Sequence, residues 1–205
     1  MKSPITLEAY GRGEGDLVAL DKDHPGFRDA VYRQRRNEIA AIALAYETGT
    51  KVPDAPYTEA EHGVWRAIWD ALQPKHEALV VDELNAIQRN MSLSRDRIPQ
   101  LRTLNHQLSA TTGYRMEPVA GLVAARAFLI QLGRKVFLST QYIRHTSRPF
   151  YTPEPDIVHE LIGHAATLVH PQIAEVNFLL GELATLATET EMARLESVYW
   201  DTMEF

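Results

Sequence analysis

The sequence predicts a mainly α-helical domain with one small β-sheet. Apolar residues recur at helical spacing through most of the 205 residues. Only two short runs, 114–119 and 136–143, are rich in strand-forming residues, which limits the expected sheet to a few strands. A chain of this length can bury a single core without disulfides.

Most of the predicted helices carry a local start or stop signal. Thr58 and Glu61 have the spacing of a capping box, and so do Thr188 and Glu191 at the start of the last helix. Pro74 is expected to end the helix that Thr58 opens. A loop rich in proline at 148–155 leads to Asp156, whose carboxylate can cap the next helix. The predicted helices span residues 25–47, 58–74, 78–90, 99–111, 124–132, a stretch from 156, 171–187, and 188 to the end.

The N-terminal stretch differs from the rest of the chain in composition and in hydrophobic periodicity. Residues 1–20 are rich in glycine and acidic residues and show no sustained periodicity, so we expect an irregular lead-in. Residues 21–205 are predicted to form the folded domain. No apolar run of about 18 residues could span a bilayer and no signal peptide is visible, so a cytoplasmic protein is expected.

Composition excludes several function classes. The formal net charge of -6 leaves no basic surplus for phosphates, so we expect neither nucleic acid nor membrane as a partner. The chain has no cysteine, which excludes disulfides, thiolate catalysis and cysteine-ligated metal. A small neutral or zwitterionic ligand suits this charge better; the oligomeric state stays open.

The segment with the most chemical information is HELIGH at 159–164. His159 and His164 are five residues apart, whereas the zinc-protease signature places its histidines four apart. On an ideal α-helix a separation of five puts the side chains about 140° apart, too wide to share one ion. Gly163 permits a local distortion, and a π-type turn would bring the two rings nearly into line.

A third ligand must come from elsewhere in the chain. One carboxylate would complete the two-histidine, one-carboxylate triad that holds non-haem Fe(II) and leaves coordination positions open. Spacing alone does not choose among the candidates, which are Glu175, Glu182, Glu191, Glu196 and Glu204.

Several further motifs together resemble one family. They are STQYIRH at 139–145, YTPEPD at 151–156, HELIGH at 159–164 and YWDTMEF at 199–205. The combination resembles the catalytic core of the pterin-dependent aromatic amino-acid hydroxylases, and within them it is most similar to the phenylalanine-hydroxylating catalytic domains. The resemblance implies that His159, His164 and Glu204 bind ferrous iron, and that 21–205 is a catalytic domain lacking the family's usual C-terminal part.

The same resemblance implies the substrate contacts. Arg144 and Thr152 would hold the amino-acid carboxylate, the arginine through a two-pronged charge-assisted pair. Pro153 and Trp200 would shape the pocket for the aromatic ring. The alternatives without a substrate role are a structural salt bridge for Arg144 and core packing for Pro153 and Trp200.

The cofactor contacts also follow from the resemblance. Gly121, Val123 and Phe128 match the pterin-binding stretch, and Glu160 would face the pterin. The family often has serines where Ala124 and Ala125 stand here, which puts one polar contact in doubt. Tetrahydrobiopterin or a related tetrahydropterin is the implied second cofactor beside Fe(II), with Glu160 and Arg144 taking part in catalysis.

The activity implied is hydroxylation of an aromatic amino acid, most directly of phenylalanine to tyrosine, with O₂ and the tetrahydropterin as co-substrates. Two alternatives stay open: a zinc hydrolase with Glu160 as general base, and a non-catalytic relative that binds an amino acid or a pterin. Seven other polar residues are expected to be exposed to solvent, namely His62, His76, His106, His170, Arg33, Arg35 and Arg36. Trp65 and Trp69 are expected in the core.

Overall fold

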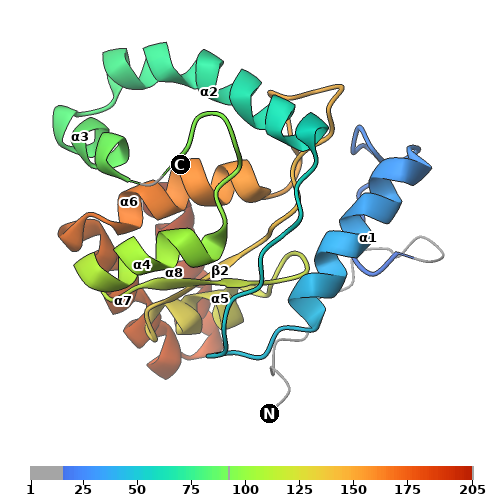
Figure 1. Cartoon of the computed structure of the whole chain (residues 1–205). Coiled ribbons are helices and arrows are strands. Elements are labelled where there is room, and N and C mark those ends of the chain that lie inside the picture. The colour runs from blue at the N-terminus through green and yellow to red at the C-terminus, as the bar shows by residue number, and fades with distance from the viewer. Residues whose placement is uncertain (1–15, 92, 205) are drawn as a thin grey trace.

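The computed structural model describes residues 16–91 and 93–204, and it confirms a mainly helical fold with a small sheet (Figure 1). The expected N-terminal lead-in falls outside this part up to residue 15. The elements in chain order are α1 (Ala30–Leu44), α2 (Glu59–Leu79), α3 (Asp82–Asn90), α4 (Leu101–Thr111), β1 (Arg115–Pro118), α5 (Ala125–Leu132), β2 (Val136–Ser139), η1 (His159–Ala165), α6 (Ala166–Leu168), α7 (Pro171–Leu186), α8 (Glu189–Tyr199) and η2 (Trp200–Glu204).

The predicted capping boxes are present in the structure. The Thr58 side chain accepts a hydrogen bond from the Glu61 backbone N–H, and the Glu61 carboxylate accepts from the Thr58 N–H. Thr188 and Glu191 make the same reciprocal pair at the start of α8. These local hydrogen bonds satisfy backbone donors that a helix cannot satisfy internally, which explains why they could be read from sequence.

The prediction that Pro74 ends the second helix was wrong. Helix α2 continues through Pro74 to Leu79. The last turn is held by α3, because the Asn85 amide donates to the His76 carbonyl at 2.8 Å and the His76 ring contacts Gln88 at 3.0 Å. These tertiary contacts offset the backbone hydrogen bond that a proline removes.

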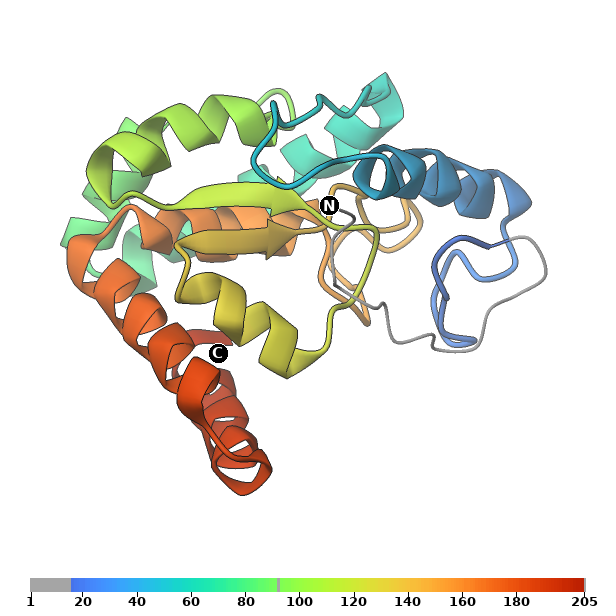
Figure 2. The ribbon, with the colours of Figure 1, turned by 90° about the horizontal axis from the view of Figure 1, so that it is seen from below.

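The sheet consists of two parallel strands joined by α5. Arg115 pairs with Val136 and the register runs to Pro118 opposite Ser139. The second strand is shorter than the predicted 136–143, because the Thr140 N–H donates to the Glu160 carboxylate instead of to a neighbouring strand. Helix α4 covers one face of the sheet and α5 the other (Figure 2).

The core confirms the two tryptophans as interior residues. Trp65 is 0% exposed and Trp69 is 5% exposed, and their rings meet edge to face at 6.0 Å. The expectation of solvent was wrong for three polar residues. His62 is buried and accepts from the Ile98 N–H, His170 is buried against Glu83, and Arg36 is buried in an ion pair with Glu154. Their partners come from distant segments, which local polarity does not reveal.

Helix α5 and helix α7 approach each other so closely that only glycine fits at the crossing. A Cβ on Gly181 would lie 1.9 Å from the Gly133 backbone nitrogen. Arg126 then donates to the carbonyls of Ala184 and Ala187 at the end of α7. The hairpin of α7 and α8, which leads to η2, is thereby fixed against α5.

Residues 16–29, the described part of the segment before α1, pack against the fold without a helix or strand. Leu20 is 5% exposed, and the Asp16 carboxylate pairs with Arg33 at 2.8 Å. The domain boundary at residue 20 stays a prediction. In the described part of the chain, none of the helices combines the length and apolar character needed to cross a bilayer.

Candidate active site

The two histidines of HELIGH meet because their helix is a π-helix. Element η1 spans His159–Ala165, and the Nε2 atoms of His159 and His164 lie 2.9 Å apart. In a π-helix the backbone hydrogen bonds join residues five apart, so those side chains fall in line. The predicted π turn is confirmed. Gly163 is not what permits it, since a Cβ there would meet nothing within 4 Å and its φ is not positive.

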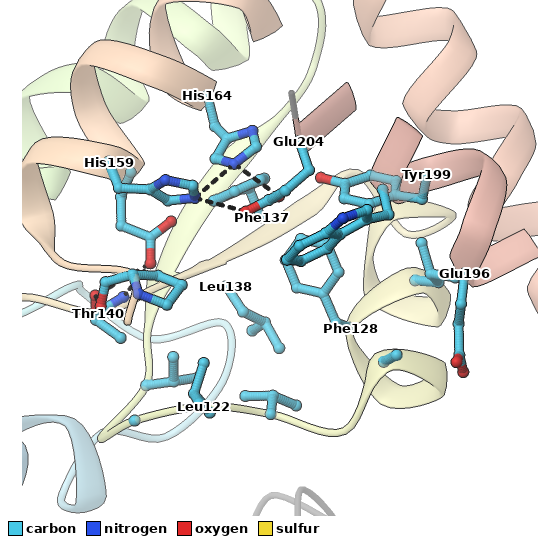
Figure 3. A pocket seen from close by; sticks show the side chains of 18 of the residues that line it. Leu122, Phe128, Phe137, Leu138, Thr140, His159, His164, Glu196, Tyr199 and Glu204 are labelled. Atoms are coloured by element: carbon cyan, nitrogen blue, oxygen red, sulfur yellow. Dashed lines mark hydrogen bonds and ion pairs between the residues drawn. The ribbon is translucent and has the colours of Figure 1, made fainter. Parts of the chain in front are cut away.

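Glu204, on the last element of the described chain, supplies the third possible metal ligand. Its Oε1 lies 3.1 Å from His159 Nε2, and its Oε2 lies 3.3 Å from His164 Nε2 (Figure 3). Element η2 carries Glu204, following the α7–α8 hairpin. Among the described residues, His159, His164 and Glu204 form the cluster that could hold a metal, so the other candidate glutamates are not part of it.

The spacing of these donor atoms fits a metal ion. Bonds of about 2.1 Å at right angles place neighbouring ligand atoms roughly 3.0 Å apart. The two ring nitrogens lie 2.9 Å apart, and they lie 3.1 and 3.3 Å from different oxygens of Glu204, so both oxygens of the carboxylate face the space that an ion would occupy. Two imidazoles and one carboxylate, without thiolate, are the donor set of non-haem Fe(II) sites with open positions.

The electrostatics of Glu204 and His164 favour the forms that bind a metal, whereas those of His159 favour its protonated ring. Burial opposes ionisation of Glu204, but hydrogen bonds from His159 and His164 outweigh it and hold the pKa of the carboxyl well below its usual range. Burial lowers the pKa of His164 and favours its neutral ring. Burial acts the same way on His159, yet the carboxylates of Glu204 and Glu160 outweigh it and raise its pKa.

A cavity of about 530 Å³ opens from this cluster. Its wall is apolar on the side of Leu122, Phe128 and Leu138 (Figure 3). The residues predicted for cofactor, ring and metal that line it are Gly121, Val123, Phe128, His159, Glu160, His164, Trp200 and Glu204. Residues separated by up to 83 positions in sequence therefore share one space.

Glu160 is a buried acid on the cavity wall. Burial raises the pKa of its carboxyl to about 7, although Oε1 accepts hydrogen bonds from the Thr140 N–H and from the Thr140 hydroxyl, both at 3.1 Å. Nothing in the sequence indicated this role for Thr140, which fell inside the predicted strand 136–143. Because the observed strand ends at Ser139, the Thr140 N–H has no strand partner and is satisfied by Glu160.

Two aromatic residues of the cavity were also missed. Phe137 lies against the His164 ring at 4.9 Å, and Tyr199 lies five residues before Glu204. Both are almost fully buried, at 1% and 7% exposure. An aromatic residue at helical or strand spacing is more often core than site, so the sequence alone offered no reason to single them out.

The predicted substrate residues of the 144–153 stretch lie outside the cavity lining. Arg144 makes a two-pronged pair with Asp156, from Nε to Oδ2 at 2.8 Å and from NH2 to Oδ1 at 2.7 Å. The Asp156 carboxylate also caps the start of the helix that carries His159 and His164, where it accepts a hydrogen bond from the His159 N–H at 3.2 Å. The Thr152 hydroxyl donates to the Glu154 carbonyl. The salt-bridge alternative for Arg144 is thus present in the structure, while Pro155 is the proline that reaches the cavity.

The chain was compared with known families, proteins and structures. Residues 16–205 match the family model described as biopterin-dependent aromatic amino acid hydroxylase. A tyrosine 3-monooxygenase from Schistosoma mansoni is 42% identical over 91% of this chain and 41% of its own length. A phenylalanine-4-hydroxylase from Mus musculus is 40% identical over 98% of this chain and 46% of its own length.

Solved structures agree on the fold. Phenylalanine hydroxylase from Chromobacterium violaceum, in a structure with bound iron(III) and 7,8-dihydrobiopterin, superposes with a TM-score of 0.72 at 23% identity. The match covers 84% of this chain and 62% of that one. The chain therefore spans less than half the length of these two curated relatives and about three fifths of this structure. The family match over nearly the whole chain shows that it belongs to the biopterin-dependent aromatic amino acid hydroxylases.

Proposed function

We propose that this chain carries the catalytic centre of an iron- and tetrahydropterin-dependent monooxygenase that hydroxylates the ring of an aromatic amino acid, with phenylalanine as the preferred substrate. The observation that carries the proposal is the convergence of His159, His164 and Glu204 at one end of an apolar cavity. The C. violaceum relative holds iron and a dihydropterin, which supports the same cofactors here.

The residues of this chain have separable tasks in that reaction. His159, His164 and Glu204 would hold Fe(II), which together with a tetrahydropterin supplies O₂ activation when both are bound. The two imidazoles and one carboxylate cancel only one of the two positive charges of the ion, which keeps it attractive to anionic ligands. The cavity wall of Leu122, Phe128 and Leu138 would exclude water from the reacting ring.

Glu160 would serve the cofactor side of the cavity. Its carboxyl lines the space and is oriented by Thr140. With a pKa near 7 it can hold or release a proton at Oε2 while Oε1 stays bound to Thr140. Gly121 and Val123 would contact the pterin on the same side, and Phe128 offers a face on which a flat ring can stack.

Substrate preference is proposed from Trp200 and Arg144. Trp200 lines the cavity and, in the family, a tryptophan there is typical of members that hydroxylate phenylalanine and tyrosine rather than tryptophan. Arg144 would bind the amino-acid carboxylate with its remaining N–H groups while Asp156 orients the guanidinium. Phenylalanine is placed ahead of tyrosine by a modest margin.

The zinc-hydrolase alternative is disfavoured by the family match, because residues 16–205 match the biopterin-dependent aromatic amino acid hydroxylases. A π-helix with histidines five apart also differs from the four-residue spacing of those proteases. Metal analysis separates the two, since iron-dependent turnover is expected here and zinc should not support it.

The deciding experiment is turnover by the iron-loaded chain. Protein loaded anaerobically with Fe(II) should convert phenylalanine to tyrosine in the presence of O₂ and tetrahydrobiopterin, with tyrosine second and tryptophan last in kcat/KM. Tryptophan ahead of phenylalanine would overturn the substrate ranking. Stoichiometric binding of amino acid or pterin with no product would favour the non-catalytic alternative.

A further inference from the structure

The metal ligands come from two elements that are far apart in the chain. His159 and His164 lie on η1, whereas Glu204 lies on η2, 40 residues after the second histidine. A site of this kind tolerates little misplacement, because ligand positions must hold to a fraction of an ångström. Something must therefore fix the distance between η1 and η2.

An unbroken series of aromatic contacts spans that distance. The His164 ring lies 4.9 Å from Phe137, Phe137 lies 5.4 Å from Phe128, and Phe128 lies 5.5 Å from Tyr199. Figure 3 shows the rings of Phe137, Phe128 and Tyr199 beside the cluster to which His164 belongs. Tyr199 ends α8 and is followed directly by η2.

Phe128 is the common member of this series. It meets Phe137 at an interplanar angle of 87° and Tyr199 at 76°, both edge to face. Edge-to-face pairs add directional energy to ordinary burial, so their loss disturbs orientation as well as packing. One ring thus touches the strand that supports His164 and the helix that leads to Glu204.

The helix that carries Phe128 is itself held firmly. Gly133 at its end meets Gly181 of α7 backbone to backbone, and Arg126 near its start binds the carbonyls of Ala184 and Ala187. A ring on such a helix is a fixed reference against which the two ligand elements can be aligned.

We propose that Phe128 is a positioning residue for the metal ligands, in addition to forming the cavity wall on which a pterin would stack. This rests on the proposed metal centre. Its consequence is that the metal affinity of the chain without any pterin depends on a side chain that touches no ligand atom. Removing a group that orients a ligand by direct contact typically changes metal affinity by about 10- to 100-fold, and Phe128 acts through Phe137, so the low end of that range is expected.

The test uses Co²⁺ as a spectroscopic probe on the metal-free chain, with no pterin present. Phe128→Leu keeps an apolar side chain but loses the ring, and Phe128→Tyr keeps the ring. Ile130→Ala is the matched control, because Ile130 packs against the same core from the same helix and lies outside the cavity lining. Co²⁺ affinity, the visible d–d spectrum and the melting temperature are measured for each variant.

We expect Phe128→Leu to bind Co²⁺ on the order of 10-fold more weakly, with an altered d–d spectrum. Phe128→Tyr should keep the Co²⁺ affinity and the d–d spectrum of the unaltered chain. Ile130→Ala should also keep both, but should lower the melting temperature. Wild-type affinity and spectrum in Phe128→Leu, or an equal loss in Ile130→Ala, would overturn the positioning role. If His159→Ala bound Co²⁺ as well as the unaltered chain, the metal centre itself would be refuted, and the role of Phe128 with it.

Discussion

In the metal cluster three side chains turn their donor atoms toward one another, whereas Arg144 and Asp156 satisfy each other's charge and hydrogen bonds within the protein. The first arrangement gathers two ring nitrogens and a carboxylate that could share a cation. The second has its charges balanced without any ligand. Although the two are joined through Asp156, which caps η1, they should respond differently to substitution.

The difference teaches where each kind of site gets its stability. An ion that binds the folded cluster but not the unfolded chain stabilises the fold by mass action. A closed ion pair contributes whether or not a ligand is present, and breaking one that is buried leaves an uncompensated charge. Metal removal should therefore affect the first region, and substitution at Arg144 the second.

The largest effect is expected from removing a metal ligand. His159→Ala or His164→Ala should abolish both iron retention and hydroxylation, because two donors cannot hold the ion in the required geometry. His170→Ala is the control, since that histidine is buried in a contact with Glu83. Iron content after gel filtration and product formation check the prediction. Stoichiometric iron with normal turnover in either ligand variant would contradict it.

A smaller effect is expected from Arg144→Lys. Lysine keeps the charge but loses the planar fork, so KM or kcat/KM for the amino acid should worsen by about 10- to 150-fold while iron content stays unchanged. Arg102→Lys is a matched control, because Arg102 makes the same fork to Asp54 on the surface. An unchanged KM together with a lowered melting temperature would show that Arg144 serves only as a salt bridge.

A pH effect on stability should come from His24, which like Arg144 and Asp156 is enclosed by partners within the protein. Burial and the charge of Arg36 lower the pKa of its ring from 6.5 to about 4. As the pH is lowered, His24 takes up a proton near pH 6.5 in the unfolded chain but only near pH 4 in the folded chain. The free energy of unfolding should therefore decrease between pH 6.5 and pH 4, by up to about 3 kcal/mol.

Urea unfolding at pH 7, 5.5 and 4.5 measures this slope. His24→Gln should flatten it, because glutamine does not titrate. His106→Gln is the control, since His106 is exposed, and it should leave the slope as it is. Equal slopes in the His24 variant and the unaltered chain would assign the pH dependence to other groups.

The smallest effect is expected at Gly163. An added Cβ meets nothing within 4 Å, so Gly163→Ala should keep the metal site and raise the free energy of unfolding by up to about 1 kcal/mol. The same change at Gly181 would place a Cβ 1.9 Å from the Gly133 nitrogen and should destabilise the fold strongly. Thermal unfolding and Co²⁺ binding compare them; loss of the metal in Gly163→Ala would show that the π turn does need glycine.

Local features of the fold were readable from sequence because their causes are local. The Thr58–Glu61 and Thr188–Glu191 caps join residues three apart, and the five-residue spacing of His159 and His164 already required a π turn for shared ligation. The continuation of α2 through Pro74 was not readable, since contacts with α3 decide it.

By itself the sequence determined the chemistry of the donors, namely two imidazoles at a π-helical spacing, an absence of cysteine and a set of available glutamates. Only the tertiary structure selected Glu204 from that set by distance, although the family resemblance had pointed to it. It also decided that Arg36 and His62 are buried and that Phe137 and Tyr199 line the cavity beside His164. The reason is physical: residue type sets what a side chain can bind, but which groups meet depends on helix packing across many tens of residues.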